Sequence, residues 1–194
     1  ATMTTWDKVA DAIADLVAKP RARPYAERYV ADVEISAGYM HSGYPIMTHL
    51  DAATFMTDPA QFIDKGWGPY HELGHNHQQP EWTFEGTTEV TCNIFSMYVL
   101  DTVCGAKDAC KQKVVSDEAV KLRQNYFKNG ASFDEWKREP FLALQMYAQL
   151  QIAFGWDPFR KVFAEYRSLA KNERPTLEPD RRDQWMIRMS RATR

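Results

Sequence analysis

The 194-residue sequence predicts a single α+β domain that is predominantly helical and carries a small β-sheet. Three observations lead to this prediction. Apolar residues repeat at helical spacing over most of the chain, strand-like patterning is confined to residues 28–47, and no linker divides the sequence. With 44% hydrophobic and 13% aromatic residues, a chain of this length can bury a core without covalent cross-links.

The first 50 residues are predicted to form one helix and two short strands. Apolar residues recur at helical spacing from Trp6 to Val17, and Pro20 ends that helix. Residues 28–35 are rich in β-branched and aromatic side chains, as strands are, and residues 38–47 indicate a second strand among glycine and proline turns. We expect these strands to form the small sheet.

Helices are predicted for most of the remaining chain. Residues 58–59, Asp-Pro, are a typical helix start, whereas residues 66–69, Gly-Trp-Gly-Pro, are expected to form a loop into a helix that begins near Pro69. The segment 141–154 is apolar on nearly all sides, which predicts a central buried helix. Further helices are predicted by caps and apolar spacing at residues 116–129, 157–169 and 182–189.

The composition argues against two classes of partner. The formal net charge is −2, so there is no basic excess that would bind nucleic acid or an anionic membrane surface. No uninterrupted apolar run reaches the length of a membrane-spanning helix. We therefore expect no nucleic-acid partner and no membrane span, and the oligomeric state is left open.

A His-Glu-Leu-Gly-His motif at residues 71–75 indicates a metal site. On a helix, His71 and His75 lie one turn apart on the same face, with Glu72 beside them. Two neutral imidazoles can hold Zn²⁺ and leave coordination positions open, where zinc acidifies a water molecule. Because Glu72 has the chemistry of a general base for that water, the motif predicts zinc-dependent hydrolysis.

The third protein ligand is predicted to be a carboxylate from a second helix. The metzincin pattern requires Gly and His three and six residues after His75, but Gln78 and Glu81 occupy those positions, which excludes that class. Glu85 and Glu89 are the candidates. Glu89 is favoured because it lies in a stretch with helical apolar spacing, whereas Glu85 precedes a glycine.

Residues near the motif are assigned lesser roles. Asn93, one turn beyond the favoured glutamate, is expected to hydrogen-bond a metal ligand. His77 is turned away from the ligand face, so a surface or capping role is predicted. Cys92 is interpreted as a small buried residue rather than a ligand. Cys104 and Cys110 are expected to form a disulfide in an oxidising compartment and to be thiols in the cytosol.

Three segments together resemble a known family signature. Residues 70–78, Tyr-His-Glu-Leu-Gly-His-Asn-His-Gln, are followed by Trp82 and by residues 85–94, Glu-Gly-Thr-Thr-Glu-Val-Thr-Cys-Asn-Ile. This pattern resembles the enhancin-like, mucin-degrading zinc metallopeptidases, peptidase family M-sixty. Residues 38–47 are also similar to the strand segment that precedes the active-site helix in that family.

The resemblance implies a gluzincin-like zinc metallopeptidase core with the small sheet next to the HExxH helix. It implies that His71, His75 and Glu89 bind zinc and that Glu72 is the catalytic base. It further implies an endopeptidase, secreted or at the cell surface, that acts on mucin-like glycoproteins. Catalytic domains of the family are longer, so residues 1–194 are expected to be a catalytic domain from a longer protein.

Substrate contacts are predicted for the segment 38–47. An edge strand beside the active-site helix of gluzincins binds the substrate backbone, so Gly43 and Tyr44 are candidate substrate-binding residues, and an ordinary structural strand fits the same sequence. Two alternative functions are kept open: a zinc-containing domain that binds glycoproteins without cleaving them, and a gluzincin aminopeptidase. An aminopeptidase needs a group that captures the free amine, and no acidic motif closely precedes residue 71.

Overall fold

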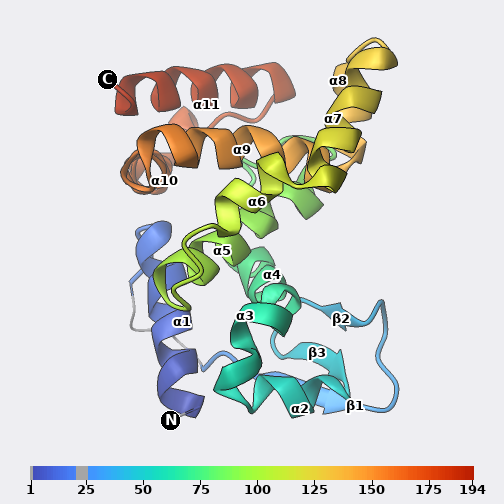
Figure 1. The fold of residues 1–194 in the computed structure, drawn as a ribbon. Helices are drawn as coiled ribbons and strands as arrows, with labels where there is room; N and C mark the ends of the chain where they lie inside the picture. The colour runs from blue at the N-terminus through green and yellow to red at the C-terminus, as the bar shows by residue number, and fades with distance from the viewer. Residues whose placement is uncertain (1, 21–25) are drawn as a thin grey trace.

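The computed structural model describes residues 2–20 and 26–194 (Figure 1). The strands are β1 (Tyr29–Asp32), β2 (Met40–His41) and β3 (Ile46–His49). The α-helices are α1 (Thr2–Leu16), α2 (Ala52–Met56), α3 (Phe62–Lys65), α4 (Trp67–His75), α5 (Thr88–Thr102), α6 (Ala109–Val115), α7 (Asp117–Lys128), α8 (Phe133–Arg138), α9 (Pro140–Phe154), α10 (Asp157–Ser168) and α11 (Glu178–Ala192). Short 3₁₀ helices occur at η1 (Pro59–Gln61) and η2 (Lys171–Glu173).

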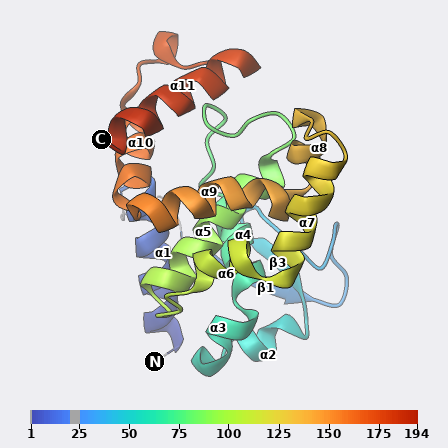
Figure 2. The same cartoon turned by 45° about the horizontal axis from the view of Figure 1, so that its top comes forward.

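The sheet and the C-terminal helices lie at opposite ends of the molecule, with α4 and α5 between them (Figures 1 and 2). Strand order is β1-β3-β2; β1 pairs parallel to β3 and β2 pairs antiparallel to it. The predicted helical fold with a small sheet is confirmed, with one strand more than expected because the second predicted segment turns back on itself. No described helix combines the length and apolar character that crossing a bilayer requires.

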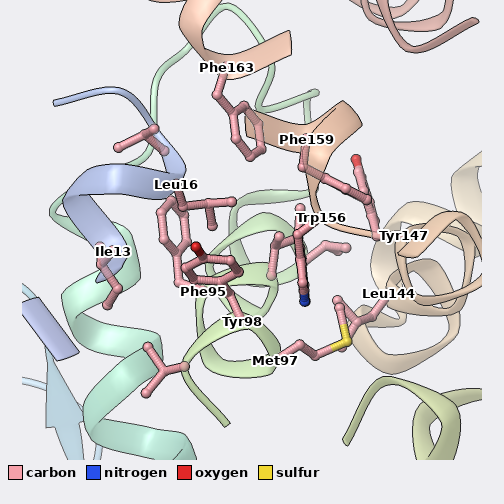
Figure 3. Packing of buried hydrophobic residues seen from close by; sticks show 14 of the residues in the cluster. Ile13, Leu16, Phe95, Met97, Tyr98, Leu144, Tyr147, Trp156, Phe159 and Phe163 are labelled. Atoms are coloured by element: carbon pink, nitrogen blue, oxygen red, sulfur yellow. The ribbon is translucent and has the colours of Figure 1, made fainter. Parts of the chain in front are cut away.

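Helix α5 is the centre of the hydrophobic core. Every residue from Val90 to Asp101 is buried, because α1, α4, α6 and α9 pack around this helix. Figure 3 shows side chains of α5 meeting those of α1, α9 and α10. The core residues labelled there are Ile13, Leu16, Phe95, Met97, Tyr98, Leu144, Tyr147, Trp156, Phe159 and Phe163.

Two helix starts that the sequence predicted have the expected caps. The side chain of Ser116 accepts a hydrogen bond from the backbone N–H of Ala119 and so satisfies a free donor at the start of α7. The side chain of Asp58 likewise accepts one from the N–H of Ala60 at the start of η1, with Pro59 in its first position.

The loop predicted for residues 66–69 is wrong, because α4 already begins at Trp67. Gly66, the residue before it, has φ −74° and ψ −12°, close to helical values. Pro69 falls in the first turn of α4, where a backbone N–H has no acceptor within the helix. Proline therefore costs little at that position, and its presence does not mark the start of the helix.

The prediction that residues 141–154 form a fully buried helix is wrong in part. The side chains of Phe141, Ile152 and Phe154 in α9 are 43–49% exposed. The six buried residues of α9 lie between Leu142 and Ala148, where the helix packs mainly on α5 and α6, and its last residues are exposed. An apolar composition therefore does not ensure burial when a helix lies at the edge of a domain.

The disulfide considered for Cys104 and Cys110 is absent, and both residues are free thiols. Cys110 lies in the hydrophobic core, where burial raises the pKa of its thiol to about 12. The Cys104 sulfur lies 3.5 Å from the hydroxyl oxygen of Tyr70. Each thiol is thus placed within the packing of the helices.

Gly74 allows α4 and α5 to approach closely. A Cβ atom at this position would stand 2.7 Å from the backbone oxygen of Cys92 and 2.9 Å from Cδ2 of Phe95, both on α5. Real Cβ atoms do not approach a backbone oxygen so closely. A larger residue would therefore force the two helices apart.

We predict that Gly74→Ala lowers the free energy of unfolding by about 1–3 kcal/mol, the usual cost of overpacking. Without the close contact, alanine would stabilise an exposed helix by about 1 kcal/mol. Gly68→Ala is the matched control, because a Cβ there meets only the flexible Met40 sulfur at 3.3 Å. Urea denaturation measures both variants, and a Gly74→Ala protein as stable as wild type would contradict the predicted clash.

Candidate metal centre

The candidate metal centre lies where α4 and α5 meet. His71 and His75 are one turn apart on α4, and Glu89 lies in the first turn of α5. His71 Nε2 is 3.0 Å from His75 Nε2 and 3.1 Å from Glu89 Oε2, and His75 Nε2 is 3.5 Å from that same oxygen. The structure thus brings together the three residues that the sequence proposed as ligands.

The spacing of these three atoms fits a small tetrahedral cation. Ligand atoms about 2.0–2.1 Å from such an ion are separated from one another by about 3.3 Å. The three observed separations of 3.0–3.5 Å bracket that value. The Glu89 side chain is 59% exposed, whereas those of His71 and His75 are 17% and 13% exposed, so the site opens to solvent on the glutamate side.

Asn93 fixes the orientation of the His71 ring. Its Oδ1 is 2.7 Å from His71 Nδ1, and its Nδ2 donates to the backbone oxygen of Glu89 at 2.7 Å. The Trp67 indole N–H donates to the same Oδ1 at 2.9 Å, so this oxygen is an acceptor. The proton of a neutral His71 therefore lies on Nδ1, and Nε2 presents its lone pair to the metal position.

Gln78 fixes the orientation of the His75 ring. The sequence analysis did not assign this role to Gln78. Gln78 Oε1 is 2.8 Å from His75 Nδ1, while its Nε2 donates to the backbone oxygen of Thr88 and to the Thr91 hydroxyl, at 2.7 and 2.6 Å. These two donations make Oε1 the atom that faces His75. The only available signal was the position of Gln78 three residues after the ligand, just beyond the end of α4.

Glu72 is buried and lines a cleft of about 460 Å³, together with His71 and Glu89. Burial raises the pKa of the Glu72 carboxyl above its ordinary value, and the Glu89 charge adds to that rise. The nearby His71 and His75, and a hydrogen bond from the backbone of Ser42, lower it. A carboxyl poised between these influences is suited to accepting and releasing a proton.

Cys92 belongs to the same cluster but is not oriented as the other ligands are. Its sulfur is 3.4 Å from His71 Nδ1 and 3.5 Å from His71 Nε2. Nearly equal distances to both ring nitrogens place the sulfur over the ring, not in line with a lone pair. Burial also raises the pKa of the Cys92 thiol well above its ordinary value, which keeps the thiol protonated.

The residues predicted to bind substrate lie in the turn between β2 and β3. The backbone N–H of Gly43 donates to Asn76 Oδ1, and the Gly43 oxygen accepts from Asn76 Nδ2, each at 3.0 Å. Asn76 follows α4, so these bonds attach the turn to the end of the metal helix. The Tyr44 side chain is 49% exposed and lines a different hollow, with Arg28 and Pro45.

Of the surface or capping role predicted for His77, the surface part is wrong, whereas the His77 ring does contact a carbonyl in the last turn of α4. His77 is only 2% exposed, and its Nδ1 is 2.8 Å from the backbone oxygen of Leu73. Its ring also lies 6.3 Å from that of Phe95. The chain turns inward after α4, so the helical geometry that placed His77 at the surface does not extend to it.

This chain is similar in sequence to curated proteins named TRPM8 channel-associated factors. TRPM8 channel-associated factor 2 of Bos taurus is 44% identical over 188 residues, which are 95% of this chain and 20% of that protein. TRPM8 channel-associated factor 1 of Homo sapiens is 40% identical over 187 residues, 93% of this chain and 20% of that protein. The chain therefore spans about a fifth of the length of the curated relatives it matches.

The same fold occurs in a crystal structure of a functionally unknown conserved protein from Bacillus anthracis str. Ames, with a TM-score of 0.79 and 22% identity. That match covers 100% of this chain and 40% of the other. The family model for peptidase M60, enhancin and enhancin-like proteins matches residues 1–194, in agreement with the resemblance of residues 70–94. This chain belongs to the peptidase M60, enhancin and enhancin-like family.

Proposed function

We propose that this domain is a zinc-dependent endopeptidase that hydrolyses peptide bonds in glycoproteins, in particular mucin-like O-glycosylated proteins. The observation that carries the proposal is the triangle formed by two imidazole nitrogens and one carboxylate oxygen, beside Glu72 in an open cleft. Two histidines and a glutamate are a donor set that catalytic zinc prefers. Membership of the family supports the substrate class, and secretion or attachment to the cell surface is part of the same proposal.

The residues of the cleft account for the remaining chemistry. When bound by His71, His75 and Glu89, zinc supplies a Lewis acid that polarises the scissile carbonyl and acidifies water. Glu72 takes the proton of the attacking water and delivers it to the leaving amine. No side chain acts as a nucleophile in this scheme, so no covalent intermediate with the protein is expected.

The lining of the cleft supports an endopeptidase over an aminopeptidase. Among the described residues, the only carboxylates that line it are Glu72 and Glu89, which already have roles as base and ligand. None of the described lining residues offers a further acidic group that could pair with a free amine. The edge strand β2, which contributes Met40 to the cleft, is available to pair with an extended peptide.

A non-cleaving glycoprotein-binding domain is the second candidate. It is favoured by the names of the relatives, which describe association with a channel and not hydrolysis. Glu72 argues against it, since a domain that only binds has no use for a buried base beside the metal position. The following comparison separates the two functions.

We predict that the zinc-loaded domain cleaves an O-glycosylated mucin, and that Glu72→Gln reduces cleavage about 10²–10⁴-fold at unchanged zinc content. Glu89→Gln should lose zinc, whereas Glu85→Gln, the carboxylate rejected as a ligand, should retain both zinc and activity. Zinc is quantified by metal analysis, and casein and deglycosylated mucin test the need for glycans. Stoichiometric zinc without cleavage of any substrate would favour the binding domain instead.

We predict that Asn93→Ala and Gln78→Ala each weaken zinc affinity about 10- to 100-fold, because each removes the acceptor that holds an imidazole proton on Nδ1. Gln79→Ala is the control, since the Gln79 amide contacts the Trp82 indole and not a ligand. Competition with a chromophoric chelator measures the dissociation constants. Equal affinities in the Gln78 and Gln79 variants would contradict the role assigned to Gln78.

A further inference from the structure

Trp67 connects the cleft to the ligand helix α5. Its indole lines the cleft, and its N–H donates to Asn93 Oδ1, the oxygen that also faces His71 Nδ1. The backbone oxygen of Trp67 accepts from the Ser96 hydroxyl at 3.0 Å, which attaches the start of α4 to α5. The orientation of the indole therefore bears directly on the amide that orients His71.

An ammonium group from a third helix stands over this indole. Lys113, in the last turn of α6, has its Nζ 3.8 Å from the centroid of the Trp67 ring and 5.1 Å from that of Phe141. Lys113 is partly buried, and burial lowers the pKa of its ammonium group, with Cys110 opposing that change. No carboxylate contributes to the shift, so the two aromatic faces are the compensation that the structure provides for this charge.

A cation on the face of an indole has two effects on its N–H. It restrains rotation of the ring, and it draws electron density toward itself, which makes the N–H a stronger donor. Both effects strengthen the hydrogen bond to Asn93 and hold the amide oxygen toward His71. Lys113 does not line the cleft, so it has no direct contact through which to act on a metal or substrate.

We propose that Lys113 is a positioning residue of the metal centre, which acts through Trp67 and Asn93 to hold His71 in the zinc-binding tautomer. The contacts that carry this proposal run in sequence: ammonium over indole, indole N–H to amide oxygen, amide oxygen to imidazole. The proposal rests on the proposed function only in taking zinc as the ion, and it does not depend on peptidase activity.

The test compares zinc dissociation constants of wild type, Lys113→Met, Lys113→Arg and Lys111→Met. Lys113→Met should weaken zinc affinity about three- to tenfold. Lys113→Arg keeps a cation over the ring and should stay within about twofold of wild type. Lys111→Met removes the same charge from an exposed position of α6 and should change nothing. Equal zinc affinity in wild type and Lys113→Met would overturn the proposal.

A double-mutant cycle with Trp67→Phe distinguishes positioning from general destabilisation. Phenylalanine keeps a ring but lacks the N–H, so Lys113→Met should have no further effect on zinc affinity in that background. An equal effect in both backgrounds would overturn the proposal. Nitrogen-15 shifts of the His71 ring in the metal-free protein should show less of the Nδ1–H tautomer in Lys113→Met. This last measurement decides the matter even if wild type binds no zinc, a result that would refute the proposed function.

Discussion

The contact of α4 with α5 at Gly74 is the constraint on which the site depends. Because residue 74 has no side chain, α4 rests directly on the backbone of α5. His71 and His75 then face Glu89 at distances a single cation can bridge. Because α5 is enclosed by the core along its buried length, it cannot move aside to accommodate a larger residue.

Two amide side chains complete what the helix contact begins. Each presents its oxygen to one histidine and uses its nitrogen to bond elsewhere, Asn93 to a backbone oxygen of its own helix and Gln78 to the residues at the start of α5. The direction of each amide is thereby determined by the protein and not by the ligand. Both imidazoles are prepared for an ion, so little reorganisation is needed when one binds.

Much of this arrangement could be predicted from the sequence because it depends on local geometry. The i, i+4 spacing places His71 and His75 together on any helix, and apolar periodicity separated Glu89 from Glu85. Their grouping is now observed, whereas their binding of zinc stays a prediction. The predominantly helical composition followed from the same periodicity.

Other features depend on tertiary contacts that no local pattern reports. Gln78 lies beyond the end of α4, and only the path of the following loop brings it back to His75. Lys113 is one of two lysines on α6 and is distinguished only by the rings it contacts. The exposed residues at the ends of α9 were missed because apolar side chains look the same in sequence whether or not another helix covers them.

The loop of residues 76–87 begins directly after one proposed ligand, His75, and ends two residues before another, Glu89. An ion held by His75 and Glu89 would close this loop as a covalent cross-link does, and so restrict the conformations open to the unfolded chain. Release of the ion would return that freedom to the segment and permit it to open locally while the core stays folded. The same atoms that perform the proposed chemistry would thus also determine how easily a protease can reach the surrounding chain.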